Sequence, residues 1–124
     1  MKPAAVKIVT LICKQDRLSA EEFQTYYENN HAPLARRLFP MIGDYRRNFV
    51  DRKATVWPDG EKLPDYDVLT ELSFDTEEDY RAFQAEFAKP EVIAQVRADE
   101  ANFLQTPKTR RLVVREAISP RNAR

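Results

Sequence analysis

The chain alternates between segments with the pattern of strands and segments with the pattern of helices. Residues 6–14, 44–50, 66–74 and 109–116 are rich in β-branched and aromatic residues and are predicted to be strands. Residues 19–38 and 90–104, and a segment that begins at 75–78 and includes Phe87, carry apolar residues three and four positions apart and are predicted to be helices. The predicted order is strand, helix, strand, strand, helix, helix, strand.

That order is the split βαβ arrangement of a ferredoxin-like α+β fold, with a four-stranded antiparallel sheet and helices on one face. The first predicted strand is apolar on both sides, with Ile8 and Ile12 on one face and Val9 and Leu11 on the other. Because the helices cover one face, we expect a homodimer that packs sheet against sheet and forms a dimeric α+β barrel. The domain is predicted to span residues 1–116, with a tail over 117–124.

The first predicted helix has a well-defined start and an unusual end. Ser19 can cap the helix, and Glu22 can complete a capping box with it. The single histidine, His31, is followed by Ala32 and Pro33, so the helix is expected to kink or end near this residue.

Helical geometry sets His31 at the border of an apolar stripe. At about 100° per residue, His31 lies roughly 60° from the centre of the stripe, a position suited to a pocket wall. An unperturbed imidazole titrates near pH ~6.5 and can therefore give or take a proton in neutral conditions. The alternative is a helix-end histidine that binds backbone carbonyls. The stripe consists of Phe23, Tyr27, Asn30 and Leu34.

Two neighbouring carboxylates, Asp99 and Glu100, lie on the predicted helix 90–104. Glu100 falls inside the apolar stripe of this helix and Asp99 lies at its border. A carboxylate on an apolar surface needs a partner or a raised pKa, and either would suit a general acid or a base paired with His31. The alternative is an ion pair with an arginine such as Arg47 or Arg111, or exposure near the helix end.

Further side chains are candidates for holding a ligand. Tyrosines can line an aromatic pocket and donate hydrogen bonds, with ordinary core packing as the alternative for each. A buried amide at Asn30 must be paired, which makes it a candidate to bind a ligand or orient the histidine. Trp57 lies in a long predicted loop, 51–64, where it either caps the pocket or packs the loop. The candidates are Tyr26, Tyr27, Asn30, Tyr45 and Trp57.

Composition narrows the classes of function. Lys+Arg and Asp+Glu each number 20, so no overall charge attracts nucleic acid or an anionic membrane surface. No stretch approaches the ~18 apolar residues of a transmembrane helix, and the N-terminus lacks a signal-peptide pattern, so a cytoplasmic protein is expected. One histidine and one cysteine give no metal-ligand spacing, and no haem, flavin, nicotinamide or nucleotide motif is present. We therefore expect neither a metal nor a cofactor.

Four segments, taken together, resemble the EthD domain family: residues 26–34 (Tyr-Tyr-Glu-Asn-Asn-His-Ala-Pro-Leu), 45–49 (Tyr-Arg-Arg-Asn-Phe), 66–68 (Tyr-Asp-Val) and 99–104 (Asp-Glu-Ala-Asn-Phe-Leu). The resemblance runs from about residue 6 to residue 116 and implies a dimeric α+β barrel. The helix histidine of the family corresponds to His31, and its acidic pair before an aromatic residue corresponds to Asp99, Glu100 and Phe103. The resemblance thus adds Phe103 to the candidate ligand contacts.

The resemblance also implies a range of activities, because the family includes proteins of ether-degradation gene clusters, cofactor-free isomerases, and polyketide-tailoring dehydratases or oxygenases. The stretch around His31 is most similar to the tailoring group. The leading hypothesis is a cofactor-independent enzyme that dehydrates or isomerises a small apolar or aromatic, polyketide-like compound, with His31 and Glu100 or Asp99 moving protons. One alternative is a cofactor-free oxygenase of a phenolic or anthrone-type substrate. Another is a non-catalytic, dimeric accessory protein that binds small molecules.

Overall fold

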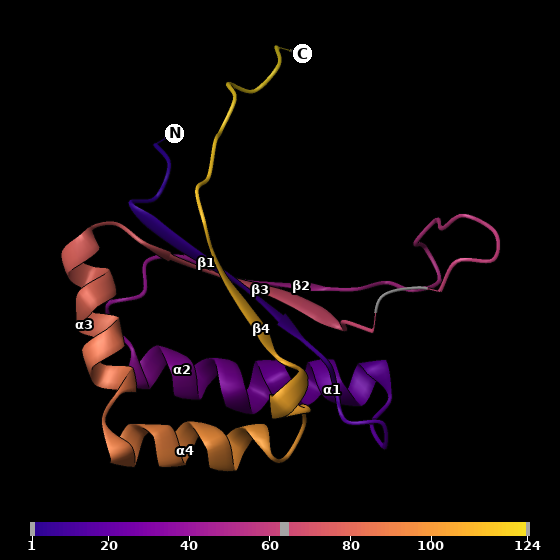
Figure 1. The fold of residues 1–124 in the computed structure, drawn as a ribbon, viewed down its shortest axis with the longest axis horizontal. Helices are drawn as coiled ribbons and strands as arrows, with labels where there is room; N and C mark the ends of the chain where they lie inside the picture. The colour runs from indigo at the N-terminus through magenta and orange to yellow at the C-terminus, as the bar shows by residue number, and fades with distance from the viewer. Residues whose placement is uncertain (1, 63–64, 124) are drawn as a thin grey trace.

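The computed structural model describes residues 2–62 and 65–123 (Figure 1). Four strands, β1 (Val6–Ile12), β2 (Tyr45–Phe49), β3 (Val68–Phe74) and β4 (Arg110–Val114), form one antiparallel sheet in the order β2-β3-β1-β4. The predicted domain start (residue 1), part of the predicted loop (63–64) and the last tail residue (124) lie outside the described residues.

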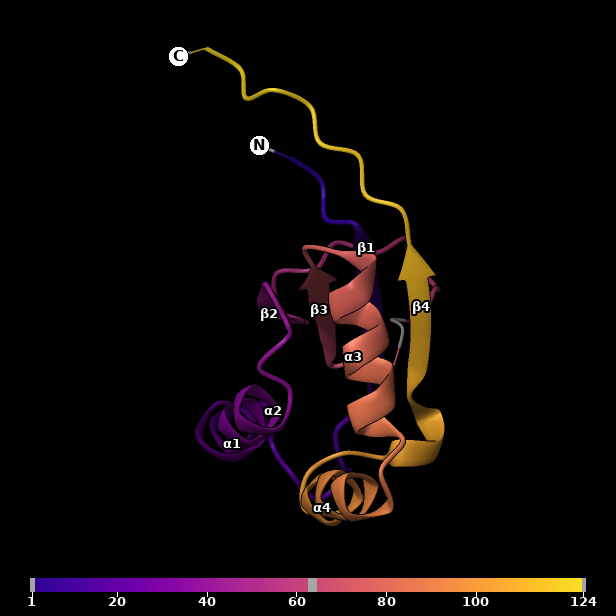
Figure 2. The ribbon, with the colours of Figure 1, turned by 90° about the vertical axis from the view of Figure 1, so that its left-hand side faces the viewer.

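Helical segments fill the two crossovers of the sheet. Between β1 and β2 the chain forms α1 (Ala20–Tyr26), the π-helical turn η1 (Tyr27–His31) and α2 (Ala32–Leu38). Between β3 and β4 it forms α3 (Glu77–Phe87), α4 (Pro90–Glu100) and the short 3-10 helix η2 (Thr106–Lys108). The helices gather on one side of the sheet (Figures 1 and 2). The predicted ferredoxin-like α+β fold with a four-stranded antiparallel sheet is therefore confirmed.

Strand register divides the sheet into a helix-facing side and an outer face. Thr10 of β1 lies opposite Thr70 of β3 and Arg111 of β4, and directly opposed residues point to the same face. Ile8 and Phe74, both buried, lie on this helix-facing side and belong to the core. The outer face carries the alternate residues: Lys7, Val9, Leu11, Arg46, Asn48, Leu69, Glu71, Ser73, Arg110, Leu112 and Val114.

The start of α1 has the predicted local chemistry. The Ser19 hydroxyl accepts the Glu22 N–H at 3.0 Å, and the Glu22 carboxylate accepts the Ser19 N–H at 2.9 Å, which completes the capping box. Leu18 packs on the core cluster that contains Phe23. These contacts satisfy the donors that a helix start otherwise leaves unpaired.

The helix predicted over 19–38 is present, but η1 interrupts it and ends at His31, the residue near which a kink or an end was expected. The Ala32 N–H donates to the Tyr27 carbonyl, five residues back, so this turn is wider than an α-helical turn. In a regular α-helix Tyr26 and His31 would project about 140° apart. Since a π-turn places residues five apart nearly above one another, both side chains can reach the same partner.

The fourth helix also ends differently from the prediction, at Glu100 rather than near Leu104. The chain turns there, and residues 13–15 and 103–105 run side by side: the Gln15 N–H donates to the Phe103 carbonyl at 2.9 Å, and the Gln105 N–H donates to the Cys13 carbonyl at 2.8 Å. These bonds tie the end of α4 to the end of β1. The tie holds residues 99–103 beside the π-turn.

Part of the outer face is apolar and uncovered. Leu69 is 37% exposed and Leu112 is 50% exposed. Beyond the sheet, the C-terminal segment runs past the N-terminus as an extended chain (Figures 1 and 2). None of the helices in the described ranges is long and apolar enough to cross a membrane.

Candidate active site

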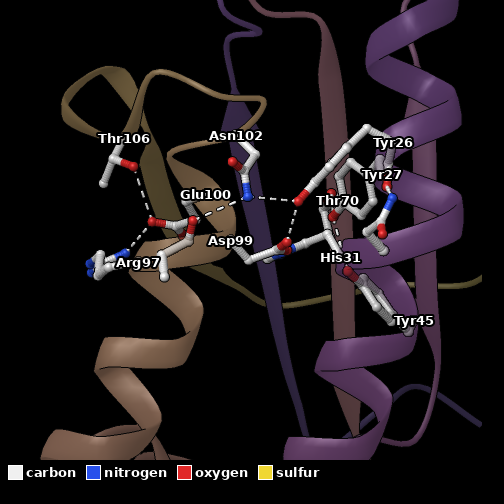
Figure 3. Close-up of polar contacts among 12 residues, drawn as sticks. Tyr26, Tyr27, His31, Tyr45, Thr70, Arg97, Asp99, Glu100, Asn102 and Thr106 are labelled. Carbon is white, nitrogen blue, oxygen red and sulfur yellow. Dashed lines mark hydrogen bonds and ion pairs between the residues drawn. The ribbon is translucent and has the colours of Figure 1, made fainter.

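His31 and Asp99 form the central contact of the site (Figure 3). The Nδ1 atom of His31, at the end of η1, lies 2.7 Å from Oδ2 of Asp99, in the last turn of α4. Each side chain is only 13% exposed, so water screens this pair weakly. The sequence predicted that Asp99 or Glu100 pairs with His31. In the structure, Asp99 is that partner.

Asp99 is held in turn by two further groups. The Tyr26 hydroxyl donates to the other carboxylate oxygen, Oδ1, at 2.7 Å, and the Asn102 side-chain amide donates to the Tyr26 oxygen at 2.8 Å. Burial, and the hydrogen bond to Asp99, raise the pKa of Tyr26 above its ordinary value. Tyr26 is therefore a neutral donor at physiological pH, and both oxygens of Asp99 have partners.

This arrangement fixes the tautomer of neutral His31. An ionised carboxylate only accepts hydrogen bonds, so the hydrogen of the imidazole lies on Nδ1 and the lone pair on Nε2. The imidazole ring also contacts Tyr27, edge to face with ring centroids 5.2 Å apart, and Phe103, with centroids 5.0 Å apart. The ring is thus oriented by one hydrogen bond and two aromatic contacts.

His31 lines a narrow cavity between the helices and the sheet, whereas Asp99 lies behind it. The cavity has a volume of about 70 Å³ and a largely apolar wall. A mostly apolar lining with a few polar groups is the usual lining of a ligand site. Its lining residues are Thr10, Ile12, Tyr27, His31, Leu34, Ala35, Phe39, Ile42, Tyr45, Thr70, Leu72, Phe83, Phe87, Val96, Glu100, Leu104, Thr109 and Arg111.

A chain of hydroxyl groups crosses the sheet side of the cavity. The Tyr45 hydroxyl donates to the Tyr27 oxygen at 3.0 Å, and the Tyr27 oxygen lies 2.8 Å from the Thr70 hydroxyl (Figure 3). Burial raises the pKa of both tyrosines, and the adjacent Tyr27 raises that of Tyr45 further. Both phenols therefore stay neutral and can offer polar contacts to a ligand.

An ion pair attaches the π-turn to β2. Arg47 donates two hydrogen bonds to the Glu28 carboxylate, at 2.6 and 2.8 Å, and its guanidinium lies 4.7 Å from the centre of the Tyr45 ring. The Arg47 hydrogen bonds lower the pKa of Glu28. Arg47 therefore pairs with Glu28. The alternative from the sequence, an ion pair between Arg47 and Asp99 or Glu100, is not formed.

Glu100 lines the cavity but does not pair with His31. Its Oε1 atom accepts hydrogen bonds from Arg97 at 2.6 Å and from the Thr106 hydroxyl at 3.1 Å, and the residue is only 7% exposed. Figure 3 shows the carboxylate turned toward Thr106 and away from the histidine. The predicted ion pair exists, but with Arg97 rather than with Arg111.

The predicted ligand contacts divide into those in the cavity wall and those outside it. Tyr27 and Tyr45 line the cavity, whereas Tyr26 and Phe103 lie behind the imidazole and support Asp99 and the ring. The prediction that Asn30 lies at the centre of the buried stripe is wrong. The π-turn rotates it outward, where it is exposed and donates to the Tyr26 carbonyl at 3.3 Å.

Trp57, one of the predicted ligand contacts, does not cap the cavity of His31 in this structure. Trp57 lies over the outer face of the sheet, beside Leu11 and Leu69, and does not line the cavity of His31. Loop packing, the alternative considered for this residue, agrees with that position.

Sequence reasoning did not find the threonines and the arginine of the cavity wall. Thr10 and Thr70 are buried and face each other across β1 and β3. Arg111 on β4, and Thr109 just before that strand, also line the cavity. Polar residues at alternate, inward positions of strands were the available signal. Within residues 2–62 and 65–123, no three His, Cys, Asp or Glu side chains are grouped to hold a metal ion.

Comparisons with solved structures give the same fold. An EthD family protein from Bacillus halodurans superposes with a TM-score of 0.60 at 20% identity, covering 90% of this chain and 99% of the other. A dimeric ferredoxin-like protein from Bacteroides fragilis gives 0.52 at 15% identity, covering 90% and 95%. SnoaB, a cofactor-independent oxygenase from Streptomyces nogalater, gives 0.55 for a mutant form at 13% identity, covering 92% and 94%. At these identities the likeness shows the fold alone.

Comparisons of sequence are more specific. No curated protein matches the chain. The family model described as EthD domain matches residues 15–107, which is more than half of the chain and includes His31, Asp99 and Glu100. The protein therefore belongs to the EthD domain family.

Proposed function

We propose that this protein is a cofactor-independent enzyme that transfers a proton on a small, largely aromatic compound, with His31 as the general base. The observation that carries the proposal is the contact between His31 Nδ1 and Asp99 at 2.7 Å beside a small, mostly apolar cavity. Because Nδ1 binds Asp99, the basic Nε2 atom of His31 is available to a ligand. No described side chain forms a hydrogen bond with Nε2.

In the proposed reaction, Nε2 of His31 takes a proton from a carbon next to a carbonyl group of the substrate. The C–H electron pair becomes that of an enolate, whose oxygen can accept the hydrogen of the Tyr27 hydroxyl, while Tyr45 donates its own hydrogen to the Tyr27 oxygen. Asp99 stabilises the imidazolium and holds it in place. Return of the proton to another carbon gives an isomer, whereas its transfer to a departing hydroxyl group releases water and gives the dehydrated product.

Oxygenation is a second candidate, supported by the similarity of fold to SnoaB, the cofactor-independent oxygenase. The same proton abstraction from an anthrone-type CH₂ group gives a carbanion that can combine with O₂ and a proton to form a hydroperoxide. Loss of water from that hydroperoxide leaves a carbonyl group. Dehydration and isomerisation consume no O₂, so oxygen uptake separates the candidates.

We also propose that the protein is a homodimer that pairs through its outer face. The support is the exposure of Leu69 and Leu112 on that face, together with the likeness to a dimeric ferredoxin-like protein. Exposed apolar patches commonly mark protein interfaces. Such pairing would cover the apolar residues of β1 that no helix covers.

One carbon acid tests the chemistry. Anthrone is incubated with the protein in D₂O, under nitrogen to follow exchange of its CH₂ hydrogens by NMR, and under air to follow O₂ uptake. We expect accelerated exchange that falls about 10²- to 10⁴-fold in His31→Ala, the usual contribution of a general base. The smaller ketone 2-tetralone is tested in parallel, because the cavity is narrow.

Equal exchange rates with the native protein and with His31→Ala would contradict the proposed role. The matched control is Asn30→Ala, which removes an exposed polar side chain from the same turn and should leave exchange unchanged. Absence of acceleration with both ketones would favour the non-catalytic binding protein.

A further inference from the structure

We propose that Gln15 and Arg17, in the connector between β1 and α1, are positioning residues for His31. They fix the chain that follows α4 and, through it, the carboxylate of Asp99 that orients the imidazole. The inference deepens the proposed function and rests on it only in its kinetic test, because the orientation of the ring can be measured without a substrate.

The connector supplies side-chain donors to the end of α4. The last carbonyl groups of a helix have no partner within the helix, so they need donors from elsewhere. The Gln15 side-chain amide donates from Nε2 to the carbonyl of Ala101, the C-terminal cap residue of α4, at 2.5 Å. The Arg17 guanidinium donates from Nη2 to the carbonyl of Asn102 at 2.9 Å. The two side chains therefore hold the chain at the point where it leaves the helix.

A third hydrogen bond joins the two side chains to each other. Arg17 Nε donates to Gln15 Oε1 at 2.7 Å. The Gln15 amide thus accepts through its oxygen and donates through its nitrogen, and the planar guanidinium directs its N–H groups in a fixed fork. A positive charge beside the C-terminal end of a helix is also favoured by the helix dipole. We call Gln15 and Arg17 together the connector clamp.

The connector clamp reaches His31 through Asn102 and Tyr26. The Asn102 backbone N–H donates to the Asp99 carbonyl at 3.0 Å, and the Asn102 side-chain amide donates to the Tyr26 oxygen at 2.8 Å. Tyr26 in turn donates to Asp99 Oδ1, and the other carboxylate oxygen binds His31. Release of Asn102 from Arg17 therefore loosens Tyr26 and Asp99 together, and the imidazole loses part of its fixed orientation.

The connector clamp lies apart from the cavity. Arg17 is exposed and lines a surface groove with Tyr26 and Asn102, and the lining residues of this groove are all different from those of the cavity. Gln15 does not line the cavity either. Because neither residue can touch a ligand bound beside His31, an effect of their removal on proton transfer has to be transmitted through the protein.

A purely structural brace is the competing interpretation. Hydrogen bonds at an exposed position contribute modestly to stability. If the connector clamp only braces the fold, its loss lowers the free energy of unfolding slightly and leaves the ring of His31 unchanged. If it positions Asp99, the ring responds as well.

The hydrogen on Nδ1 of His31 gives a readout without substrate. Its rate of exchange with water, measured by NMR at neutral pH, reports how often the contact with Asp99 opens. We expect this rate to rise about three- to tenfold in Arg17→Ala, the effect of one lost hydrogen bond. Gln15→Ala should act in the same direction, because it removes both side-chain bonds of Gln15 and keeps the backbone bond to Phe103. Arg17→Lys, which keeps the charge and a donor, should exchange more slowly than Arg17→Ala.

A double-mutant cycle tests whether the effect passes through Asp99. In the anthrone exchange assay we expect Arg17→Ala to lower the rate about three- to tenfold, with little change in KM, since the connector clamp does not touch the ligand. In the Asp99→Asn background the same substitution should change the rate less than about twofold, because the orienting carboxylate is already lost. The matched control is Arg81→Ala, which removes an exposed arginine paired with Glu77 on α3 and should change neither the ring nor the rate.

An unchanged exchange rate of the Nδ1 hydrogen in both Arg17→Ala and Gln15→Ala would overturn the inference and leave a structural brace. Equal rate losses from Arg17→Ala in the native and Asp99→Asn backgrounds would also overturn it, because the effect would then bypass the carboxylate. A ring that responds to the connector clamp in a protein that does not accelerate ketone exchange refutes only the proposed enzymatic function. Ketone exchange that depends on His31, with a ring that does not respond, refutes only this inference.

Discussion

His31 Nδ1 and Asp99 Oδ2 lie 2.7 Å apart although the two residues are 68 positions apart in the chain. Two local features produce this contact. The π-turn directs Tyr26 and His31 toward the same carboxylate, and the backbone bonds between residues 13–15 and 103–105 hold the end of α4 beside that turn. Asp99 is therefore placed to position the imidazole, whereas only His31 faces the cavity.

Replacing Asp99 by Asn tests that positioning role. The amide no longer offers two acceptor oxygens, so the Nδ1–H tautomer of His31 loses its preference. We expect about a 10- to 100-fold fall in the rate of ketone exchange, comparable to the loss of an orienting partner in other sites, with a smaller change in KM. The assay is the deuterium exchange of anthrone.

A spectroscopic measurement checks the same change without any substrate. Because the protein has one histidine, the ¹⁵N chemical shifts of its ring nitrogens report His31 alone. We expect the native signals to show hydrogen on Nδ1 and those of Asp99→Asn to show a mixture of tautomers. The control Asp79→Asn, on α3, should leave the signals unchanged. A native ring with hydrogen on Nε2 would refute the assignment.

Tyr26→Phe tests the hydrogen bonds that hold Asp99 in place behind His31. The change removes the hydroxyl that binds Asp99 Oδ1 and accepts from Asn102, and keeps the ring that packs 5.0 Å from Phe103. We expect the free energy of unfolding to fall by about 1 kcal/mol and the exchange rate to fall about three- to tenfold. Urea denaturation and the exchange assay measure the two effects. A rate loss as large as that of His31→Ala would show that Tyr26 takes part in the chemistry directly.

Local chemistry made much of the fold predictable. The β-branched and aromatic residues of the strands identified the four-stranded sheet, and Ser19 with Glu22 identified the start of α1. The single histidine directed attention to His31, and an acidic partner on the later helix was part of the hypothesis. The choice between Asp99 and Glu100 depends on how α4 ends, and that ending is set by backbone bonds to β1 that no local pattern reveals.

The π-turn is the main reason for the errors at the site. A regular helix puts Asn30 on the inner stripe and Tyr26 on its flank. With the wider turn, Asn30 is exposed and Tyr26 binds Asp99 beside His31. The positions of Arg111, on β4, and of Thr109, just before it, on the cavity wall were missed because they depend on the pairing of β4 with β1. Trp57 was misplaced because a loop without apolar periodicity gives no indication of which sheet face it covers.

The cluster of Lys7 with Glu71 and Glu116 makes stability depend on pH. The Lys7 hydrogen bond, then that of Asn48, lowers the pKa of Glu71 below 4.5, and Glu116, then Glu71, raises the pKa of Lys7 above 10.5. The carboxylate contribution is therefore present above pH 4.5 and is lost as the pH falls through the lowered pKa. The Lys7 contribution is present below pH 10.5 and is lost as the pH rises through the raised pKa.

Glu71→Gln should consequently lower the free energy of unfolding by about 0.5–1 kcal/mol between roughly pH 5 and pH 9. The difference from the native protein should shrink as the pH falls from 4.5 through the lowered pKa of Glu71, below which Glu71 is protonated in both folded and unfolded chains. Urea titrations at several pH values measure it. Glu77→Gln, an equal change of charge at an exposed pair with Arg81, should have little effect. A difference that persists at pH 2 would contradict the assignment.

Leu112→Glu tests the proposed homodimer. Leu112 is 50% exposed and lies opposite Val9 on the outer face, so a charge there would have to be buried when two sheets pack together. We expect native mass spectrometry and sedimentation to show a dimer for the native protein and a monomer for the variant at micromolar concentration. Val56→Glu adds the same charge at a residue 92% exposed in the loop after β2 and should remain dimeric. A native monomer would leave the apolar outer face without its proposed partner, and a dimeric Leu112→Glu would move the interface away from β4.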